Sequence, residues 1–310
     1  MFHLTGGSRS AIAAMLALPF LAACDPGATV VQGVPAKSAR PTEQHAARFA
    51  DLEKRYNARI GVLAVDTMTG ATVTNRADER FPMLSTFTPL LAAWILSVYD
   101  LHSGDADRVI HYTEADVVDH SPVASTRVAE GMTIAQLAEA AITQNDHTAG
   151  NLLLRMILEP QNFTEHLRSI GDHQSRLDRW APDLNTAIPG DERDTTTPAA
   201  LAADYRRVFL EIRPADWPEQ QLLISWLKAN RVGDKRIRAG VPAGWTTGGK
   251  TDTGSYGCAN DAAITWPGDG RPPLVIAVQT CKSAEDAQVD NAVFAEAAKI
   301  VIDSLSSSSR

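Results

Sequence analysis

The chain has 310 residues, of which 44% are hydrophobic, so it is long enough to bury one large core or two closely packed ones. Its formal net charge is −8, and its basic residues are scattered, without a basic stripe interleaved with aromatic residues. This pattern excludes nucleic acid as the expected partner. After the first residues, no apolar run is long enough to span a bilayer.

The N-terminus has the features of an export signal. Arg9 precedes an apolar stretch from Ala11 to Leu21, and small residues follow it. The run Leu21-Ala-Ala-Cys24 then resembles the bacterial lipobox, whose cysteine is lipidated and becomes the first residue of the mature protein. We therefore predict a signal peptide over residues 1–23.

Lipidation of Cys24 would place the mature protein on the outer face of the cell membrane. Several acyl chains on one residue anchor a protein stably, whereas a single chain does not. Residues 24–40 are rich in Gly, Pro, Ala and Val without periodicity, so we interpret them as a tether. The alternative is an ordinary cleaved signal in which Cys24 is incidental.

Hydrophobic periodicity predicts the helices and strands of the remaining domain, residues 41–310. In chain order we expect a helix over 41–57, strands over 59–66 and 71–75, a helix beginning at Ser85, helices over 134–144 and 146–158, helices over 201–212 and 219–229, strands over 245–253, 259–266 and 273–280, and a closing helix over 291–305. Residues 169–198 have little pattern and form an unusually long loop, which indicates a functional segment.

This order of elements predicts an α/β (α+β) fold. One mostly antiparallel, five-stranded sheet is completed from both ends of the chain and flanked by the terminal helices. We expect an α/β lobe formed by residues 41–84 and 229–310, with an all-helical lobe over residues 85–228 inserted between them.

Two cysteines remain if Cys24 carries lipid. Cys258 and Cys281 flank the last two predicted strands, which are joined by a turn at residues 267–271. An antiparallel hairpin centred on that turn places the two cysteines opposite each other. Because an exported protein meets an oxidising compartment, we predict a structural disulfide between them.

The stretch from Phe81 to Trp94 joins an extended run to an apolar helix, and Ser85 lies at the junction. A serine at a helix N-terminus is close to unpaired backbone N–H groups and to the positive end of the helix dipole. Two interpretations follow from this stretch alone. Ser85 is either a helix cap or a nucleophile beside an oxyanion site.

From about Arg48 to Leu305 the chain resembles the class A β-lactamases, most closely their actinobacterial members. Four segments in order carry the resemblance: Arg80-Phe-Pro-Met-Leu-Ser-Thr-Phe87 to the nucleophile segment, Asn151-Leu-Leu-Leu154 to the helix of the second motif, residues 178–198 to the omega loop, and residues 249–257 to the strand of the third motif. The resemblance implies the serine β-lactamase/transpeptidase-like fold, with Ser85 in the position of the nucleophile. It implies neither a metal ion nor another cofactor, and we expect a monomer.

The resemblance fails at the positions that perform the chemistry. The family motif set is Ser-x-x-Lys, Ser-Asp-Asn and Lys-Thr-Gly. Here the lysine three residues after Ser85 is replaced by Thr88, which cannot accept a proton at neutral pH. The second motif reads Asn145-Asp-His147, without the serine that relays a proton.

Two further positions depart from the family pattern. The omega-loop glutamate that activates the deacylating water is replaced by Ala181, and the glycine of the third motif is replaced by Asp252. Strand alternation places Asp252 on the same face as Lys250, where it could neutralise that lysine. We interpret Asp183, two residues after Ala181, as a surface carboxylate of the loop.

The positions that bind substrate in the family are largely retained. The resemblance assigns the oxyanion hole to the backbone N–H groups of Ser85 and Thr253. It also implies substrate contacts for a set of polar side chains: Lys250, Thr251, Asn185, Arg236 and Asn145. Arg179 and Asp194 match the ion pair that closes the neck of the omega loop.

Two retained groups have alternative interpretations. His147 is either a solvated first residue of its helix or a substitute base for Ser85. Lys250 is either a binder of the substrate carboxylate or only an ion-pair partner.

The sequence therefore predicts an exported lipoprotein of β-lactamase type with impaired or absent hydrolysis, which binds a β-lactam or a peptidoglycan-like ligand at Ser85. A single general base contributes roughly 10²–10⁴-fold to a rate, and the predicted site lacks two bases and a relay. One alternative is an active serine hydrolase with His147 as its base. Another is an envelope adaptor whose cleft is silent.

Overall fold

The computed structural model describes residues 43–212 and 217–308. The predicted signal peptide, Cys24 and the tether lie outside the described residues. No helix in the described ranges has both the length and the apolar character needed to cross a membrane.

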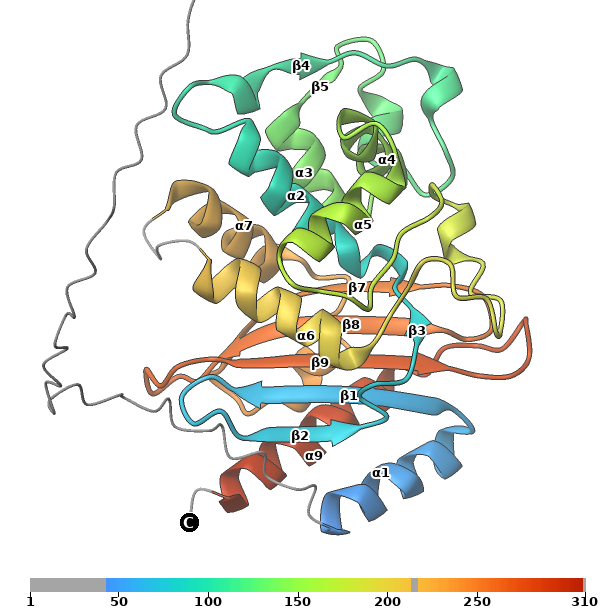
Figure 1. The fold of residues 1–310 in the computed structure, drawn as a ribbon, viewed down its shortest axis with the longest axis vertical. Helices are drawn as coiled ribbons and strands as arrows, with labels where there is room; N and C mark the ends of the chain where they lie inside the picture. The colour runs from blue at the N-terminus through green and yellow to red at the C-terminus, as the bar shows by residue number, and fades with distance from the viewer. Residues whose placement is uncertain (1–42, 213–216, 309–310) are drawn as a thin grey trace, which may run out of the picture. The chain divides into compact units, whose positions relative to one another are not determined.

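A five-stranded sheet lies at the centre of the domain (Figure 1). Its spatial order is β2-β1-β9-β8-β7, and each neighbouring pair is antiparallel. The strands are β1 (Arg59–Asp66), β2 (Thr72–Asn75), β7 (Thr246–Thr253), β8 (Ala259–Trp266) and β9 (Leu274–Cys281). The predicted sheet is confirmed, because the first two and the last three strands of the chain meet at β1 and β9.

Both faces of the sheet are covered, which explains why its central strands β1 and β9 are apolar on both sides. On one face, Ile60 and Val62 of β1 pack with Phe49 of α1 (Glu43–Tyr56) and Phe294 of α9 (Asn291–Ser308). On the other face, alternate residues such as Val65 and Ile264 join the core that contains most of the other helices. Figure 1 shows α1 and α9 together on one side of the sheet.

The second core belongs mainly to the helices between β2 and β7. These helices are α2 (Thr88–Val98), α3 (Ile134–Thr143), α4 (His147–Met156), α5 (Pro160–Ser169), α6 (Pro198–Arg206) with a π-helical turn at Arg207–Glu211, and α7 (Pro218–Ala229). Helix α8 (Ile237–Gly240) instead buries Ile237 in the first core, with α1 and α9. Short strands pair in two places, β3 (Phe81–Pro82) with β6 (Thr195–Thr196) and β4 (Val109–Ile110) with β5 (Met132–Thr133).

Helix α5 was not predicted from the sequence. Pro160 occupies its first turn, where the missing N–H costs nothing, and the buried residues Phe163 and Leu167 repeat at a helical spacing of four. Helix α3 begins with a capping box formed by Thr133 and Gln136. Thr133 accepts from the Gln136 N–H at 3.1 Å, and the Gln136 side chain accepts from the Thr133 N–H at 2.9 Å.

The predicted hairpin and disulfide are confirmed. The register of β8 and β9 pairs Ala259 with Thr280, so Cys258 and Cys281 lie opposite each other one residue further along. Their sulfur atoms are 2.03 Å apart. The bond closes the end of the hairpin that is remote from its turn.

Candidate active site

A sharp turn between β3 and α2 presents Ser85. Residues Leu84–Phe87 form a 3₁₀ turn, and Leu84 has a φ of 50°, a region that non-glycine residues avoid. The approach to the turn is held by the Asn260 amide, which donates to the carbonyls of Pro82 at 2.7 Å and Met83 at 2.9 Å. Ser85 itself is only 4% exposed.

Ser85 is not a helix cap, so that interpretation is wrong. The residue before the 3₁₀ turn is Met83 and the residue before α2 is Phe87, and neither helix has a side-chain cap. The 3₁₀ turn runs directly into the apolar helix α2. In the sequence the two therefore resemble a single helix that begins at Ser85.

The Thr88 hydroxyl is directed to the backbone. Its Oγ1 donates to the Ser85 carbonyl oxygen at 2.9 Å, one turn back along the chain. A threonine in this arrangement satisfies a backbone acceptor and offers no base at neutral pH. The position that carries lysine in related sequences is thus structural here.

The Asp252 carboxylate lies against Ser85. Its Oδ2 accepts a hydrogen bond from the Ser85 backbone N–H at 2.8 Å, and its Oδ1 accepts from the Asn145 amide at 2.9 Å. Asp252 is only 7% exposed. An anion therefore already occupies the Ser85 N–H, which the family resemblance implies is one of the two donors of the oxyanion hole.

Lys250 extends from β7 into the same cluster and is fully buried. Its ammonium donates to Oδ1 of Asn145 and to the Thr251 carbonyl at 3.3 Å. Burial lowers the pKa of Lys250 to about 8, and nearby Asp252 opposes this shift. Asn145 thus bridges Lys250 and Asp252, which form no direct ion pair among the described residues.

His147 begins α4 and is half-buried, so it is not a solvated residue. Neither ring nitrogen has a hydrogen-bond partner of good geometry, although the Asp119 backbone interacts weakly with the ring. The centre of its ring lies 5.0 Å from that of His120. Burial lowers the pKa of His147, while the Asp252 charge raises it. No hydrogen bond joins His147 to Ser85 in the described ranges.

Asp146 explains the start of α4. One carboxylate oxygen accepts from the Ala149 N–H at 2.9 Å, and the other accepts from Val123 and Ala124, each at 2.8 Å. The aspartate of the second motif thus ties the helix to a neighbouring loop. These hydrogen bonds of Asp146 also fix the positions of its two neighbours in the chain, Asn145 and His147.

The omega loop is closed at its neck. Asp194 accepts hydrogen bonds from the backbone N–H groups of Asp178 at 2.7 Å and Arg179 at 2.9 Å, and from Nε of Arg179 at 2.5 Å. Farther along the loop, the Asn151 side chain exchanges two hydrogen bonds with the backbone of Ala181, at 2.8 and 3.0 Å. The loop keeps its shape without a glutamate at position 181.

Three other predicted binding residues have different environments. The Arg236 guanidinium donates to the carbonyls of Asp252 and Asn260 and to the Thr253 hydroxyl. It therefore binds the neighbouring strands β7 and β8. The Thr251 hydroxyl and Oδ1 of Asn185 are buried and lack hydrogen-bond partners of good geometry. Neither atom is exposed in this structure, and Arg236 is engaged with the protein.

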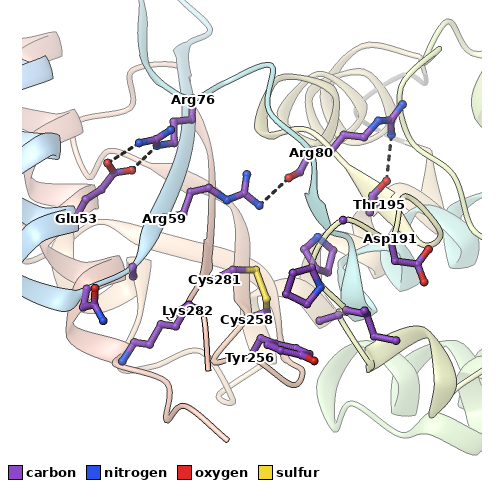
Figure 2. A pocket seen from close by; sticks show the side chains of 18 of the residues that line it. Glu53, Arg59, Arg76, Arg80, Asp191, Thr195, Tyr256, Cys258, Cys281 and Lys282 are labelled. Atoms are coloured by element: carbon purple, nitrogen blue, oxygen red, sulfur yellow. Dashed lines mark hydrogen bonds and ion pairs between the residues drawn. A yellow bond between two sulfur atoms is a disulfide. The ribbon is translucent and has the colours of Figure 1, made fainter. Parts of the chain in front are cut away.

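A cavity of about 920 Å³ lies outside the Ser85 site (Figure 2). It is bordered by the disulfide and by several basic side chains that are already engaged. Arg76 pairs with Glu53 at 2.6 Å, Arg59 donates to the Arg80 carbonyl at 2.9 Å, and Arg80 donates to Thr195. We assign no ligand to this cavity, because these three arginines are engaged by the protein itself.

Comparisons with known proteins agree with this arrangement. The Beta-lactamase enzyme family matches residues 44–305. Beta-lactamase AST-1 of Nocardia asteroides is 53% identical over 96% of this chain and 94% of its own length. The chain belongs to the class A serine β-lactamase family. Beta-lactamase FAR-1 of Nocardia farcinica is 52% identical over 84% of this chain and 82% of its own length.

Solved structures of class A β-lactamases have the same fold. The β-lactamase of Desulfarculus baarsii gives a TM-score of 0.81 at 44% identity, covering 84% of this chain and 97% of that one. An ancestral class A β-lactamase gives 0.79 at 50% identity, with coverage of 84% and 100%. The predicted family and fold are confirmed.

Sequence reasoning missed three roles within this β-lactamase fold: the contact of Asp252 with Ser85, the clamp that Asn151 forms on Ala181, and the ring contact of His120 with His147. The alternation of β7 did place Asp252 on the face of Lys250. Nothing local in the sequence indicates that the carboxylate reaches a backbone N–H located 167 residues away.

Proposed function

We propose that this β-lactamase-family protein binds a β-lactam or a peptidoglycan-like ligand at Ser85 and hydrolyses it very slowly or not at all. The observation that carries the proposal is the Asp252 carboxylate, which accepts the Ser85 backbone N–H at 2.8 Å. The donor that should stabilise the developing oxyanion is therefore engaged by an anion of the protein.

The bases around Ser85 support the same proposal. Thr88 donates to a carbonyl where acylation requires an acceptor, and Ala181 has no group that could activate water. Loss of one general base lowers a rate by roughly 10²–10⁴-fold, and residues that act as a unit lose their effect together. An oxyanion hole and binding alone leave about 10³–10⁴ over water, far less than an efficient hydrolase needs.

The names of the relatives favour a second candidate, an active β-lactamase. AST-1 and FAR-1 both carry that name at more than half identity to this chain. Such an enzyme would require a rebuilt base, for which His147 is the available group. Burial lowers the pKa of His147, so the ring is neutral and able to accept a proton at neutral pH.

Intact mass spectrometry after incubation with nitrocefin, combined with absorbance assays of its hydrolysis, distinguishes the candidates. The proposed binder should form a stable adduct, or show saturable binding, with little turnover. Turnover at an ordinary enzyme rate that is lost in His147→Ala would establish the active hydrolase instead. Neither adduct, binding nor turnover would leave an envelope adaptor with a silent cleft.

We also propose that Cys24 is the lipidated first residue of the mature protein, because the lipobox-like run directly follows an apolar stretch of signal length. Cys24→Ser should release the protein from the membrane fraction or block its processing. Unchanged fractionation of this variant would contradict lipid anchoring.

A further inference from the structure

The hydrogen bonds of Asp252 at Ser85 bear on which ligands the cleft can bind. Ser85 N–H donates to Oδ2 of Asp252, and the Asn145 amide donates to Oδ1. Both oxygens of the carboxylate therefore have a donor. Asp252, Ser85 and Asn145 are each at most 7% exposed, so water screens this cluster poorly.

The charge of Asp252 acts on the neighbouring cations Lys250 and Arg236, but neither makes an ion pair with its carboxylate among the described residues. Lys250 donates to Asn145 and to a backbone carbonyl, and Asn145 separates it from Asp252. Arg236 contacts the Asp252 carbonyl and the Thr253 hydroxyl, which lie on the strand and not at the carboxylate. The group nearest to the Ser85 N–H is consequently the anion.

We propose that the Asp252 carboxylate is a built-in occupant of the oxyanion position at Ser85 and that it makes the cleft select against ligands that bring or develop a negative charge there. The favoured ligands place an uncharged hydrogen-bond donor, such as a hydroxyl group, beside Ser85 and Asp252. This inference rests on the proposed function, because it specifies the ligand chemistry of the same site.

Phenylboronic acid is a direct probe of this selection. The Ser85 Oγ forms a bond with boron, the hydroxyl proton passes to solvent, and the tetrahedral boronate that results carries one negative charge. One boronate oxygen must then take the position held by Asp252. Affinity for this probe therefore measures the oxyanion position without a requirement for β-lactam hydrolysis.

The test measures the Kd of phenylboronic acid by calorimetry for the wild-type protein and four variants. Asp252→Gly frees the N–H donor and should lower the Kd by about 10²-fold, the scale of one oxyanion-hole donor. Asp252→Asn keeps the shape of the side chain but removes its charge, and it should lower the Kd by about tenfold, a smaller share of the same effect. Adding Ser85→Ala to Asp252→Gly should abolish the gain.

Asp183→Asn is the matched control. It removes the same charge from an exposed position in the omega loop, so screening by water and salt should keep its Kd within about twofold of the wild type. An equal gain in this control would show a general charge effect and overturn the proposal. Retention of the gain without Ser85 would overturn it as well.

An unchanged Kd in folded Asp252→Gly and Asp252→Asn would also overturn the role of Asp252. If the glycine variant fails to fold, the isosteric asparagine variant decides the question alone. Nitrocefin turnover by the wild-type protein is a separate readout. Rapid turnover contradicts the proposed function, whereas unchanged boronate affinity without turnover contradicts only the inference about Asp252.

Discussion

The neck of the omega loop and the Ser85 cleft both bury an aspartate, but the two carboxylates serve different ends. Asp194 accepts from three donors of its own loop, so it closes the neck whether or not a ligand is present. Asp252 accepts from Ser85 N–H and Asn145, groups that would face a substrate in a hydrolase. The omega loop can therefore keep its shape in a protein whose Ser85 cleft lacks the catalytic groups.

Ala181 illustrates this separation within the loop itself. Asn151 binds both its N–H and its carbonyl, so the backbone at this position is held without help from the side chain. A glutamate there would contribute chemistry, whereas the shape of the loop depends on Asn151 and Asp194. The following predictions test whether the two regions are as independent as this comparison indicates.

The largest expected effect comes from rebuilding the cleft. Combining Thr88→Lys, Asn145→Ser, Ala181→Glu and Asp252→Gly should raise nitrocefin hydrolysis by several powers of ten, about the scale of the bases restored. The reason is that the loop and the strand already hold these positions in the family arrangement. Hydrolysis is measured by absorbance, with each single substitution as a comparison.

Ser85→Ala in the rebuilt protein should abolish the gain. Restoring one residue should achieve little, since acylation and deacylation each need their own group. A large gain from Thr88→Lys alone would show that the loop position does not limit turnover. No gain from the full set would indicate a misshapen cleft.

Breaking the neck should affect stability strongly. Asp194→Ala leaves Arg179 without its buried partner and should lower the free energy of unfolding by about 3–5 kcal/mol. Urea denaturation followed by circular dichroism measures the loss. Arg193→Gln is the control, because it removes an exposed ion pair with Asp191 and should cost less than about 1 kcal/mol. Equal losses in the two variants would contradict the role of the neck.

The disulfide should contribute somewhat less to the free energy of unfolding than the neck of the omega loop does. Replacing Cys258 and Cys281 together by alanine should lower the free energy of unfolding by about 3 kcal/mol, from the entropy regained by a chain segment of 23 residues. Thermal and urea denaturation measure the change. Thiol titration of the denatured, non-reduced mature protein should find neither of these cysteines free; two free thiols there would rule the bond out.

The smallest effect concerns pH. Burial raises the pKa of Asp261 to about 7, although Arg236 and a hydrogen bond from the Ile237 N–H oppose the shift. The folded protein thus binds this proton more tightly than the unfolded chain does, and Asp261 lowers stability as the pH rises from about 4 to about 7.

Asp261→Asn should remove that dependence. Between pH 5 and pH 7 the wild-type protein should lose about 2 kcal/mol more of its free energy of unfolding than the Asp261→Asn variant does. Urea denaturation at the two pH values measures it, with Asp183→Asn as an exposed control. His166, whose pKa burial lowers to about 4, acts in the opposite direction and is present in both proteins. Identical pH profiles for wild type and Asp261→Asn would contradict the prediction.

Local pattern was sufficient for much of the fold. The limits of β1 and β8 were predicted as observed, and the short turn between β8 and β9 determined which cysteines face each other. The limits of α6 and the existence of α5 were less well predicted. Pro198 and Pro160 begin these helices, and a proline is as typical of a loop as of the first turn of a helix, so the pattern did not locate either start.

The sequence by itself determined the family, the strands, the disulfide pairing and the absence of the usual bases at positions 88 and 181, because each depends on residue identity or on short-range spacing. Only the tertiary structure decided where the Asp252 carboxylate goes. Ser85 and Asn145 donate to it from separate segments, and Asn145 lies 107 residues away along the chain. A buried carboxylate takes whichever donors the folded core brings near, and no local pattern identifies those donors in advance.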